Sequence, residues 1–170
     1  MRWTRTTRRA RSSQSLVLFP RGRSFTRRSC VNAAFFDSNI IVYSVDTRPE
    51  SKDKKEQSRE LVQMRLMTVS TQVLMETFNV LTKRDLTTRE RATAVVEDLS
   101  NGIVVTVDSV DVLRALDFAE RYQLSHWDGL ILRAAEKARV DVVYTEDMKH
   151  GETYGSVRVC NPFIEDFLTT

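Results

Sequence analysis

The sequence predicts a single α/β domain in which helices cover a short, mostly parallel sheet. Short runs of apolar, often β-branched residues alternate along the chain with amphipathic stretches long enough to form helices. The apolar runs are nearly continuous, which is typical of strands buried on both faces of a parallel sheet. With 170 residues and 41% hydrophobic content, the chain has room for one core and no second full domain.

The first expected strand covers residues 33–36 and is followed directly by Asp37. Ser38 and Asn39 come next, and both residue types cap helix N-termini well, so a helix is expected to start there. The rest of this half is expected to form a polar helix at residues 51–67, a strand at 68–70 and a helix at 71–83.

The second half is expected to open with a helix that starts at Thr87 and Glu90, which have capping-box spacing, and ends near Asn101 and Gly102. The next elements are expected to be a strand at 103–106, a helix from Asp108 or Ser109 to Tyr122, and a helix from Ser125 to Ala138. Strands are then expected at 142–145 and at 157–159, the second of them at an edge of the sheet. A closing helix is expected to start at Pro162.

The formal net charge of +3 conceals an uneven distribution. Residues 1–30 hold nine Arg and no Asp or Glu, whereas the chain from Val31 onward has 17 basic and 23 acidic residues, a net charge of −6. We therefore place the domain at residues 31–170 and leave the Arg-rich leader, residues 1–30, outside the fold. Three explanations of the leader stay open: an organelle transit peptide, a basic RNA-contacting tail, or a misassigned start in which a GUG codon at Val31 begins the chain.

Composition excludes several other classes of protein. No apolar run approaches the roughly 20 residues of a transmembrane helix, so no association with a membrane is expected. Two cysteines, Cys30 and Cys160, and two histidines, His126 and His150, are too few for a disulfide framework or a convincing zinc site. We expect a soluble cytoplasmic protein with reduced thiols.

Two Asp residues occupy positions suited to chemistry, because ligands of parallel α/β sheets bind beyond the carboxyl ends of the strands. Asp37 ends the first strand, where capping the next helix explains it equally well. Asp128 lies on the apolar face of its helix with Ile131 and Leu132. Ser125 forms an S-x-x-D capping pattern with Asp128, but an acid that only caps need not point inward, so we favour a functional role.

Two further acidic positions complete the set. Glu76 lies at the edge of an apolar helix stripe, which suits a half-buried ligand, although an isolated Glu on a helix is mostly solvated surface. Glu146 and Asp147 follow the strand at 142–145, where an ordinary polar turn is the plain alternative. We favour Asp147, with Glu146 as its assistant.

Several carboxylates in one partly dry site repel one another unless they are protonated or cations neutralise them. Mg²⁺ and Mn²⁺ prefer carboxylate and water oxygens and bridge to phosphate. A metal-activated water can attack phosphorus while an ion stabilises the leaving oxygen. The four acids together therefore indicate phosphodiester hydrolysis.

Four segments resemble the signature blocks of PIN domains, especially those of VapC-like toxins: FFDSNIIVYSVD, STQVLMETFNVLTKR, LSHWDGLILRAAEKA, and VVYTEDMKHG with VRVCNPF. The resemblance covers residues 34–167 and rests on the order and spacing of the blocks. It implies a three-layer α/β/α sandwich and an endoribonuclease that depends on Mg²⁺ or Mn²⁺ and acts as the toxin of a toxin-antitoxin pair. It also implies an RNA substrate, a cognate antitoxin and a homodimer.

The resemblance further assigns roles to individual residues. It implies that the catalytic and metal-binding acids are Asp37, Glu76, Asp128 and Asp147, with polar support from Ser38, Asn39 and Thr145. The chain departs from the family at Gly129, where Ala is usual. We expect this glycine to loosen its helix by about 1 kcal/mol relative to Ala without affecting the chemistry.

Other side chains near these acids could serve the reaction, but their plainer roles are favoured. His126 and Trp127 could act as a general acid and a base-stacking aromatic, yet packing is the expected role of both. Lys83, Arg84 and Arg133 could touch an RNA backbone, yet a solvated helix surface is expected for them.

Three alternative functions remain open at this point. The first is a catalytically silent PIN-like module that binds RNA or protein. The second is a phosphoacceptor receiver domain, which would need paired acids early in the chain and leaves Glu76 unexplained. The third is a nuclease that cuts DNA with the same metals, since metal-bound acids contact the phosphate and not the 2′-hydroxyl.

Overall fold

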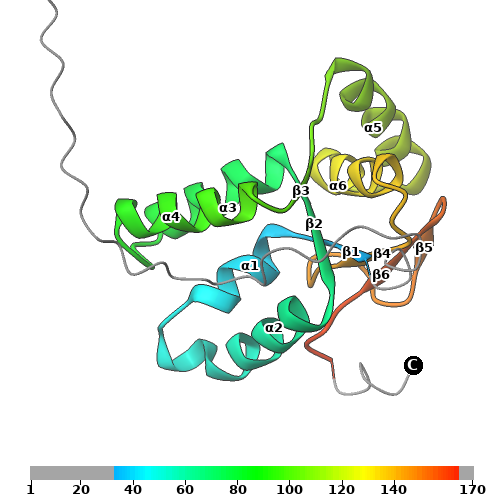
Figure 1. Ribbon diagram of the computed structural model, residues 1–170. Coiled ribbons are helices and arrows are strands. Elements are labelled where there is room, and N and C mark those ends of the chain that lie inside the picture. Colours follow the sequence, from blue (N-terminus) through cyan, green and yellow to red (C-terminus); the bar gives the residue numbers. More distant parts are fainter. Residues whose placement is uncertain (1–32, 165–170) are drawn as a thin grey trace, which may run out of the picture.

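Six strands form one sheet in the order β3-β2-β1-β4-β6-β5 (Figure 1). The computed structural model describes residues 33–164. Its strands are β1 (Ala33–Phe36), β2 (Leu66–Ser70), β3 (Ile103–Val105), β4 (Val142–Tyr144), β5 (Thr153–Tyr154) and β6 (Val157–Cys160). Neighbouring strands are parallel except β5 and β6, which are antiparallel.

The connections between the strands are helical. They comprise α1 (Ser38–Val45), the short 3₁₀ turn η2 (Pro49–Ser51), α2 (Lys52–Met64), α3 (Thr71–Lys83), α4 (Arg89–Ser100), α5 (Ser109–Tyr122) and α6 (His126–Lys137). The chain first builds the sheet outward from β1 to β3 and then returns to add β4 on the other side of β1. Because crossovers between parallel strands are right-handed, this reversal puts α1 to α4 on one face and α5 and α6 on the other.

Packing contacts agree with these layers. Helix α1 packs against α2 and α3, α3 packs against α4, and α6 packs against α5 and against the sheet (Figure 1). The fold is therefore a three-layer α/β/α sandwich. Ligand sites of such sheets form where the strand order reverses, and in this chain that point is the carboxyl edge between β1 and β4.

Large apolar side chains of the two central strands fix this edge in place. Phe35, Phe36 and Val143 have no exposed surface, and each such side chain contributes on the order of 2 kcal/mol through burial. The rings of Phe36 and Tyr144 pack at 5.3 Å between centroids, directly below the strand ends. The residues that follow β1 and β4 are thus held on a rigid base.

A buried carboxylate joins α5 to α6. Asp111 is 3% exposed and accepts hydrogen bonds from Arg133 Nε at 3.3 Å and from Lys137 Nζ. Lys137 also donates to the Thr106 carbonyl at 2.9 Å, and Asp108 completes a capping box with Asp111. These contacts hold the pKa of Asp111 below its usual range, chiefly through the Lys137 hydrogen bond.

Gly129 allows the same two helices to approach closely. A Cβ at this position would lie 2.6 Å from the Ala115 carbonyl oxygen and 3.0 Å from the Ala119 Cβ. A methyl group cannot occupy that space unless α6 moves away from α5. Gly129 was expected only to weaken its helix, whereas in the structure it also has a packing role.

The sheet differs from the expected one in two respects. The segment at 157–159 was expected to be an edge strand, but β6 lies between β4 and β5. Strand β5 was not expected. It forms a hairpin with β6 through a turn that contains Gly155 at φ +62°, and only two of its residues pair, which is too short a segment to show a strand pattern in the sequence. This short antiparallel strand takes the edge position.

Helix boundaries also differ in places. Helix α2 ends at Met64 and β2 starts at Leu66, so the expected polar helix ran three residues too far. Thr88, not Thr87, caps α4. In the closing segment, the described residues 161–164 form a turn, and the rest of the expected helix lies outside the described residues.

The leader at residues 1–30, with Cys30, also lies outside the described residues. Within the described part, Cys160 is a free, half-buried thiol, and burial raises its pKa. No helix of residues 33–164 is long and apolar enough to cross a bilayer.

Substituting Gly129 by Ala is expected to destabilise the chain by about 1–2 kcal/mol. The added Cβ would lie 2.6 Å from a backbone oxygen, which puts the overpacking cost in the upper part of its range, at about 2–3 kcal/mol, and the gain in helix propensity returns only about 1 kcal/mol. Urea unfolding would measure this difference. Gly102→Ala is the matched control, since the nearest atom to its added Cβ is a carbonyl at 3.3 Å. A Gly129→Ala variant as stable as the wild type would show that α5 and α6 are not closely packed.

Candidate functional site

Asp37 lies at the carboxyl end of β1, where the sheet order reverses. Its N–H donates to the Tyr144 carbonyl at 3.0 Å, which joins the ends of β1 and β4. Its Oδ1 accepts the Ser38 N–H at 2.6 Å and caps α1, so the capping role weighed from the sequence is confirmed. Its Oδ2 accepts from the Thr145 hydroxyl at 2.6 Å and from the Asn39 amide at 3.1 Å. Capping therefore occupies Oδ1, and Oδ2 faces the switch point, the place between β1 and β4 where the strand order reverses.

Asn39 links the residues that follow the two central strands. Its Nδ2 lies 3.0 Å from Thr145 Oγ1 and 3.0 Å from Asp147 Oδ2, besides its contact with Asp37. An amide nitrogen carries two hydrogens, so these three acceptors share two donors. The Asn39 Oδ1 atom is buried without a hydrogen-bond partner. The polar support expected at Asn39 and Thr145 is thus present, and it connects Asp147 to Asp37.

Glu76 and Asp128 come from helices on opposite faces of the sheet. Ser70 caps α3 by accepting from the Val73 N–H, and Glu76 lies half-buried in the second turn of that helix. Ser125 caps α6 by accepting the Asp128 N–H at 3.1 Å. The S-x-x-D pattern therefore has its capping role through the backbone of Asp128, which leaves the carboxylate free of that role.

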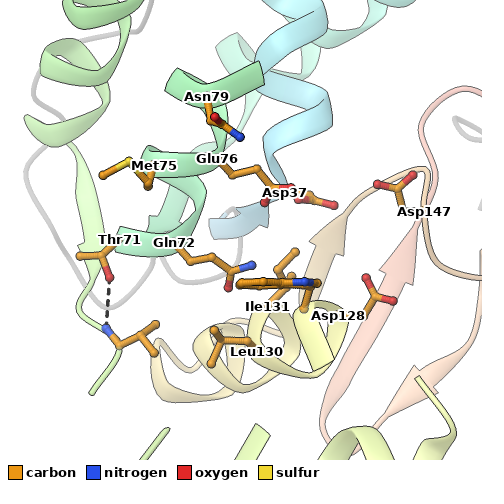
Figure 2. A pocket seen from close by; sticks show the side chains of 12 residues that line it. Asp37, Thr71, Gln72, Met75, Glu76, Asn79, Asp128, Leu130, Ile131 and Asp147 are labelled. Carbon is orange, nitrogen blue, oxygen red and sulfur yellow. Dashed lines mark hydrogen bonds between the residues drawn. The ribbon is translucent and has the colours of Figure 1, made fainter. Parts of the chain in front are cut away.

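The four carboxylates line one pocket of about 710 Å³. Figure 2 shows the carboxylates of Asp37 and Glu76 on one side of this space and those of Asp128 and Asp147 facing it from the other side. The structure thus brings together the four acids selected from the sequence, each supplied by a different segment: the end of β1, α3, α6 and the turn after β4.

Burial and mutual repulsion affect the protonation of the two inner acids. Burial raises the pKa of Asp37 from its ordinary value of 3.8 to about 6, against the opposing hydrogen bonds from Thr145 and Ser38, and the charges of Glu76 and Asp147 raise it further. Burial also raises the pKa of Glu76, with added repulsion from Asp147 and Asp128. The charged forms of both acids are therefore less favourable than those of ordinary Asp and Glu, and a nearby positive charge would offset this.

The acids of the pocket fit a hard divalent cation that keeps several waters, and they do not form a cage of protein ligands around an ion. Within residues 33–164, no three Asp, Glu, His or Cys side chains stand close enough to hold one ion between them. Mg²⁺ commonly binds through one or two carboxylates and keeps several waters, so a looser arrangement still suits it. Asp147 lines the pocket and is exposed, so burial does not fix its side chain in one position.

Glu146 belongs to a different cluster from Asp147. Its carboxylate accepts from the Tyr43 hydroxyl at 2.7 Å and from Lys54 Nζ at 2.5 Å. Lys54 also lies over the Tyr43 ring at 4.6 Å and the Phe163 ring at 5.0 Å. Both Glu146 oxygens are therefore engaged with α1 and α2, and Glu146 does not line the pocket. The assisting role expected for it has no contact to support it.

The side chains beside the acids differ from expectation in three cases. Trp127 is 68% exposed and His126 is exposed, so the packing role expected for both is wrong. Arg133 is 17% exposed and pairs with Asp111, so it is not the solvated surface residue expected. Lys83 and Arg84 are exposed, as expected.

Two residues of importance to the site were not anticipated. Asp111 positions α6 through its ion pairs, and its spacing of three from Asp108 is the capping-box signal that could have indicated it. Gln72 lines the pocket with both side-chain polar atoms buried and without partners. A Gln in the first turn of a helix carries no signal of such a position.

Comparison with solved structures supports the same fold. A toxin-antitoxin complex from Klebsiella pneumoniae is 21% identical, with a TM-score of 0.56 over 77% of this chain and 98% of that chain. VapC20 of Mycobacterium tuberculosis, described as a toxin that cleaves the sarcin-ricin loop, is 16% identical, with a TM-score of 0.54 over 68% and 92% of the two chains. VapBC2 of Rickettsia felis, bound to a promoter DNA fragment, is 16% identical, with a TM-score of 0.51 over 75% and 96%.

At these identities the structural likenesses establish the fold alone, and no curated protein sequence matches the chain. The family is established independently of them. The model of the PIN domain matches residues 34–155, most of the chain and all four pocket acids. This match excludes the receiver-domain alternative, and the chain belongs to the PIN domain family.

Proposed function

We propose that the chain is a divalent-metal-dependent endoribonuclease and the toxin of a toxin-antitoxin pair. The observation that carries the proposal is the pocket itself, in which Asp37, Glu76, Asp128 and Asp147 meet at the switch point of a PIN fold. Its catalytic domain would be residues 31–170, with the leader at 1–30 outside it, and its site of action would be the cytoplasm.

The four acids would hold Mg²⁺ or Mn²⁺, which supplies an activated water and offsets the charge of the scissile phosphate. Asp37 is the best-placed ligand, because its Oδ2 is fixed by Thr145 and Asn39. Asn39 would orient Asp147 by its hydrogen bond to Oδ2. Glu76, whose pKa is raised, can hold a proton on its carboxylate at pH values where an ordinary Glu is ionised.

An RNA substrate and a protein partner complete the proposal. One similar structure is a toxin-antitoxin complex and another is a toxin, and this supports a cognate antitoxin for the present chain. The first turns of α5 expose an apolar stripe, at Val110, Val112, Leu113 and Leu116. A row of exposed apolar side chains on one helix supports a protein interface there, and we assign it to a homodimer.

A catalytically silent module that binds RNA or protein is the second candidate. It is favoured by one observation, that the acids of the described residues do not converge tightly enough to hold an ion as they stand. DNA remains an alternative substrate for the same chemistry, because carboxylates and metals act on the phosphate.

Cleavage of a labelled single-stranded RNA by the full chain tests the proposal. We expect cutting with Mg²⁺ or Mn²⁺, none with EDTA, and a loss of roughly 100-fold or more in Asp37→Asn and in Asp128→Asn, as for groups that act on the reacting atoms. Asp141→Asn is the control, since this exposed acid precedes β4 at the opposite end of the strand. Undiminished cleavage in both pocket variants would refute the site assignment.

The raised pKa of Asp37 leads to a test that does not depend on activity. Between about 3.8 and 6, folding takes up a proton at Asp37, so the stability of the metal-free chain falls as pH rises through this window. Asp37→Asn removes this effect and is expected to stabilise the metal-free chain at about pH 7.5 by at most roughly 3 kcal/mol, a limit set by about two pKa units.

Chemical unfolding in EDTA at about pH 4 and about pH 7.5 would measure this difference. The stabilisation by Asp37→Asn should be largest at the higher pH and shrink toward the lower one, while Asp141→Asn should show no such trend. A variant that is equally or less stable than the wild type at both pH values would mean that Asp37 is not strained by burial.

A further inference from the structure

The pocket extends well beyond its carboxylates. Its volume of about 710 Å³ corresponds to roughly two dozen water molecules, whereas an octahedral ion has only about six ligand positions. Six further lining residues, which together we call the base end, are uncharged: Gln72, Met75, Val107, Trp127, Leu130 and Ile131. Metal ions and a phosphate would fill the acidic part and leave the base end available.

Trp127 provides a free aromatic surface at this end. It is 68% exposed, although Trp is among the side chains with the largest gain from burial. Among the residues that the structure describes, it takes part in no hydrogen bond, ion pair or ring contact. It directly precedes Asp128 in the first turn of α6, and both residues line the same pocket.

Gln72 provides an unpaired amide in the same place. Its Oε1 and Nε2 are both buried without partners, and among the described residues no other side chain leaves two polar atoms in this state. Figure 2 shows the Gln72 side chain reaching from α3 across the pocket toward Ile131 of α6. A buried amide without partners is costly, which suggests that its partner arrives with a ligand.

From these observations we propose that the base end is a nucleobase subsite, in which Trp127 stacks on the base next to the scissile phosphate and Gln72 hydrogen-bonds to its edge. The inference rests on the proposed function and specifies how its substrate is recognised. Unpaired bases of single-stranded RNA are bound in this way, by aromatic stacking and by hydrogen bonds to their edges.

The two residues have distinguishable roles in this subsite. Every base has a flat face, so stacking on Trp127 strengthens binding for all four bases alike. The Gln72 amide presents one donor and one acceptor side by side, and such a pair discriminates between base edges.

Cleavage assays on full-length chain with single-stranded RNAs that vary at one base test these roles. Trp127→Ala should lower kcat/KM about 10-fold for every base, the size of one lost stacking contact, and Trp127→Phe should recover most of it. Gln72→Leu should reduce the ratio between the best and the worst base about 10-fold. The matched controls are Met64→Ala and Gln63→Leu, exposed residues of α2 outside the pocket.

Fluorescence separates this inference from the proposed function. The full chain contains two Trp, and both contribute to its fluorescence. Quenching that comes from Trp127 is therefore identified as the part of the signal change that is lost in Trp127→Phe. In the Asp37→Asn background, which keeps RNA intact, we expect hexanucleotides of A, C or U to quench the emission and Trp127→Phe to abolish the change.

The outcomes are then distinct. Quenching that depends on Trp127 supports the subsite even if the wild type cuts no RNA, a result that would refute only the nuclease. No quenching up to millimolar hexanucleotide, or quenching that persists in Trp127→Phe, would overturn the subsite even if cleavage is normal. If Gln72→Leu lowers kcat/KM equally for all bases, the role of Gln72 in base discrimination would be overturned. Quenching by a basic peptide but not by RNA would overturn the nucleobase subsite and assign the base end to a protein partner.

Discussion

The buried carboxylate of Asp37 is the constraint on which the rest of the site depends. The fold places it at the end of a fully buried strand, beside the end of β4 and within the field of Glu76 and Asp147. Hydrogen bonds from Ser38, Thr145 and Asn39 hold it there, yet they do not compensate for its lost hydration. Such a group is stable as a neutral acid or as the partner of a cation, and the arrangement therefore has a thermodynamic preference for bound positive charge.

The second requirement is the position of α6, because this helix carries Asp128 and Trp127 to the pocket. The helix is held from behind by Asp111, which pairs with Arg133 and Lys137, and by the absence of a side chain at Gly129. Neither feature touches the pocket. Both act by setting the distance between α5 and α6, so the geometry of the site depends on packing that lies on the far side of the helix.

Sequence patterns predicted the fold, and they singled out Asp37 and Asp128, which do line the pocket, because these features depend on local signals. Apolar runs locate the central strands, and Asp37 and Asp128 each stand beside a recognisable cap. The patterns missed what depends on tertiary contact. Trp127 was expected to pack, yet it is 68% exposed, because the burial of a helix residue depends on which other elements cover it. The amide of Gln72, which has no hydrogen-bond partner, has no sequence signature.

Mn²⁺ binding followed by electron paramagnetic resonance is the most direct test of the central claim, that the four acids form one cation site. The account predicts that the wild-type chain binds Mn²⁺ and that Asp37→Asn, Glu76→Gln, Asp128→Asn and Asp147→Asn each weaken this binding, while Asp141→Asn does not. Binding of equal strength in all five variants, or no binding by the wild type, would contradict it.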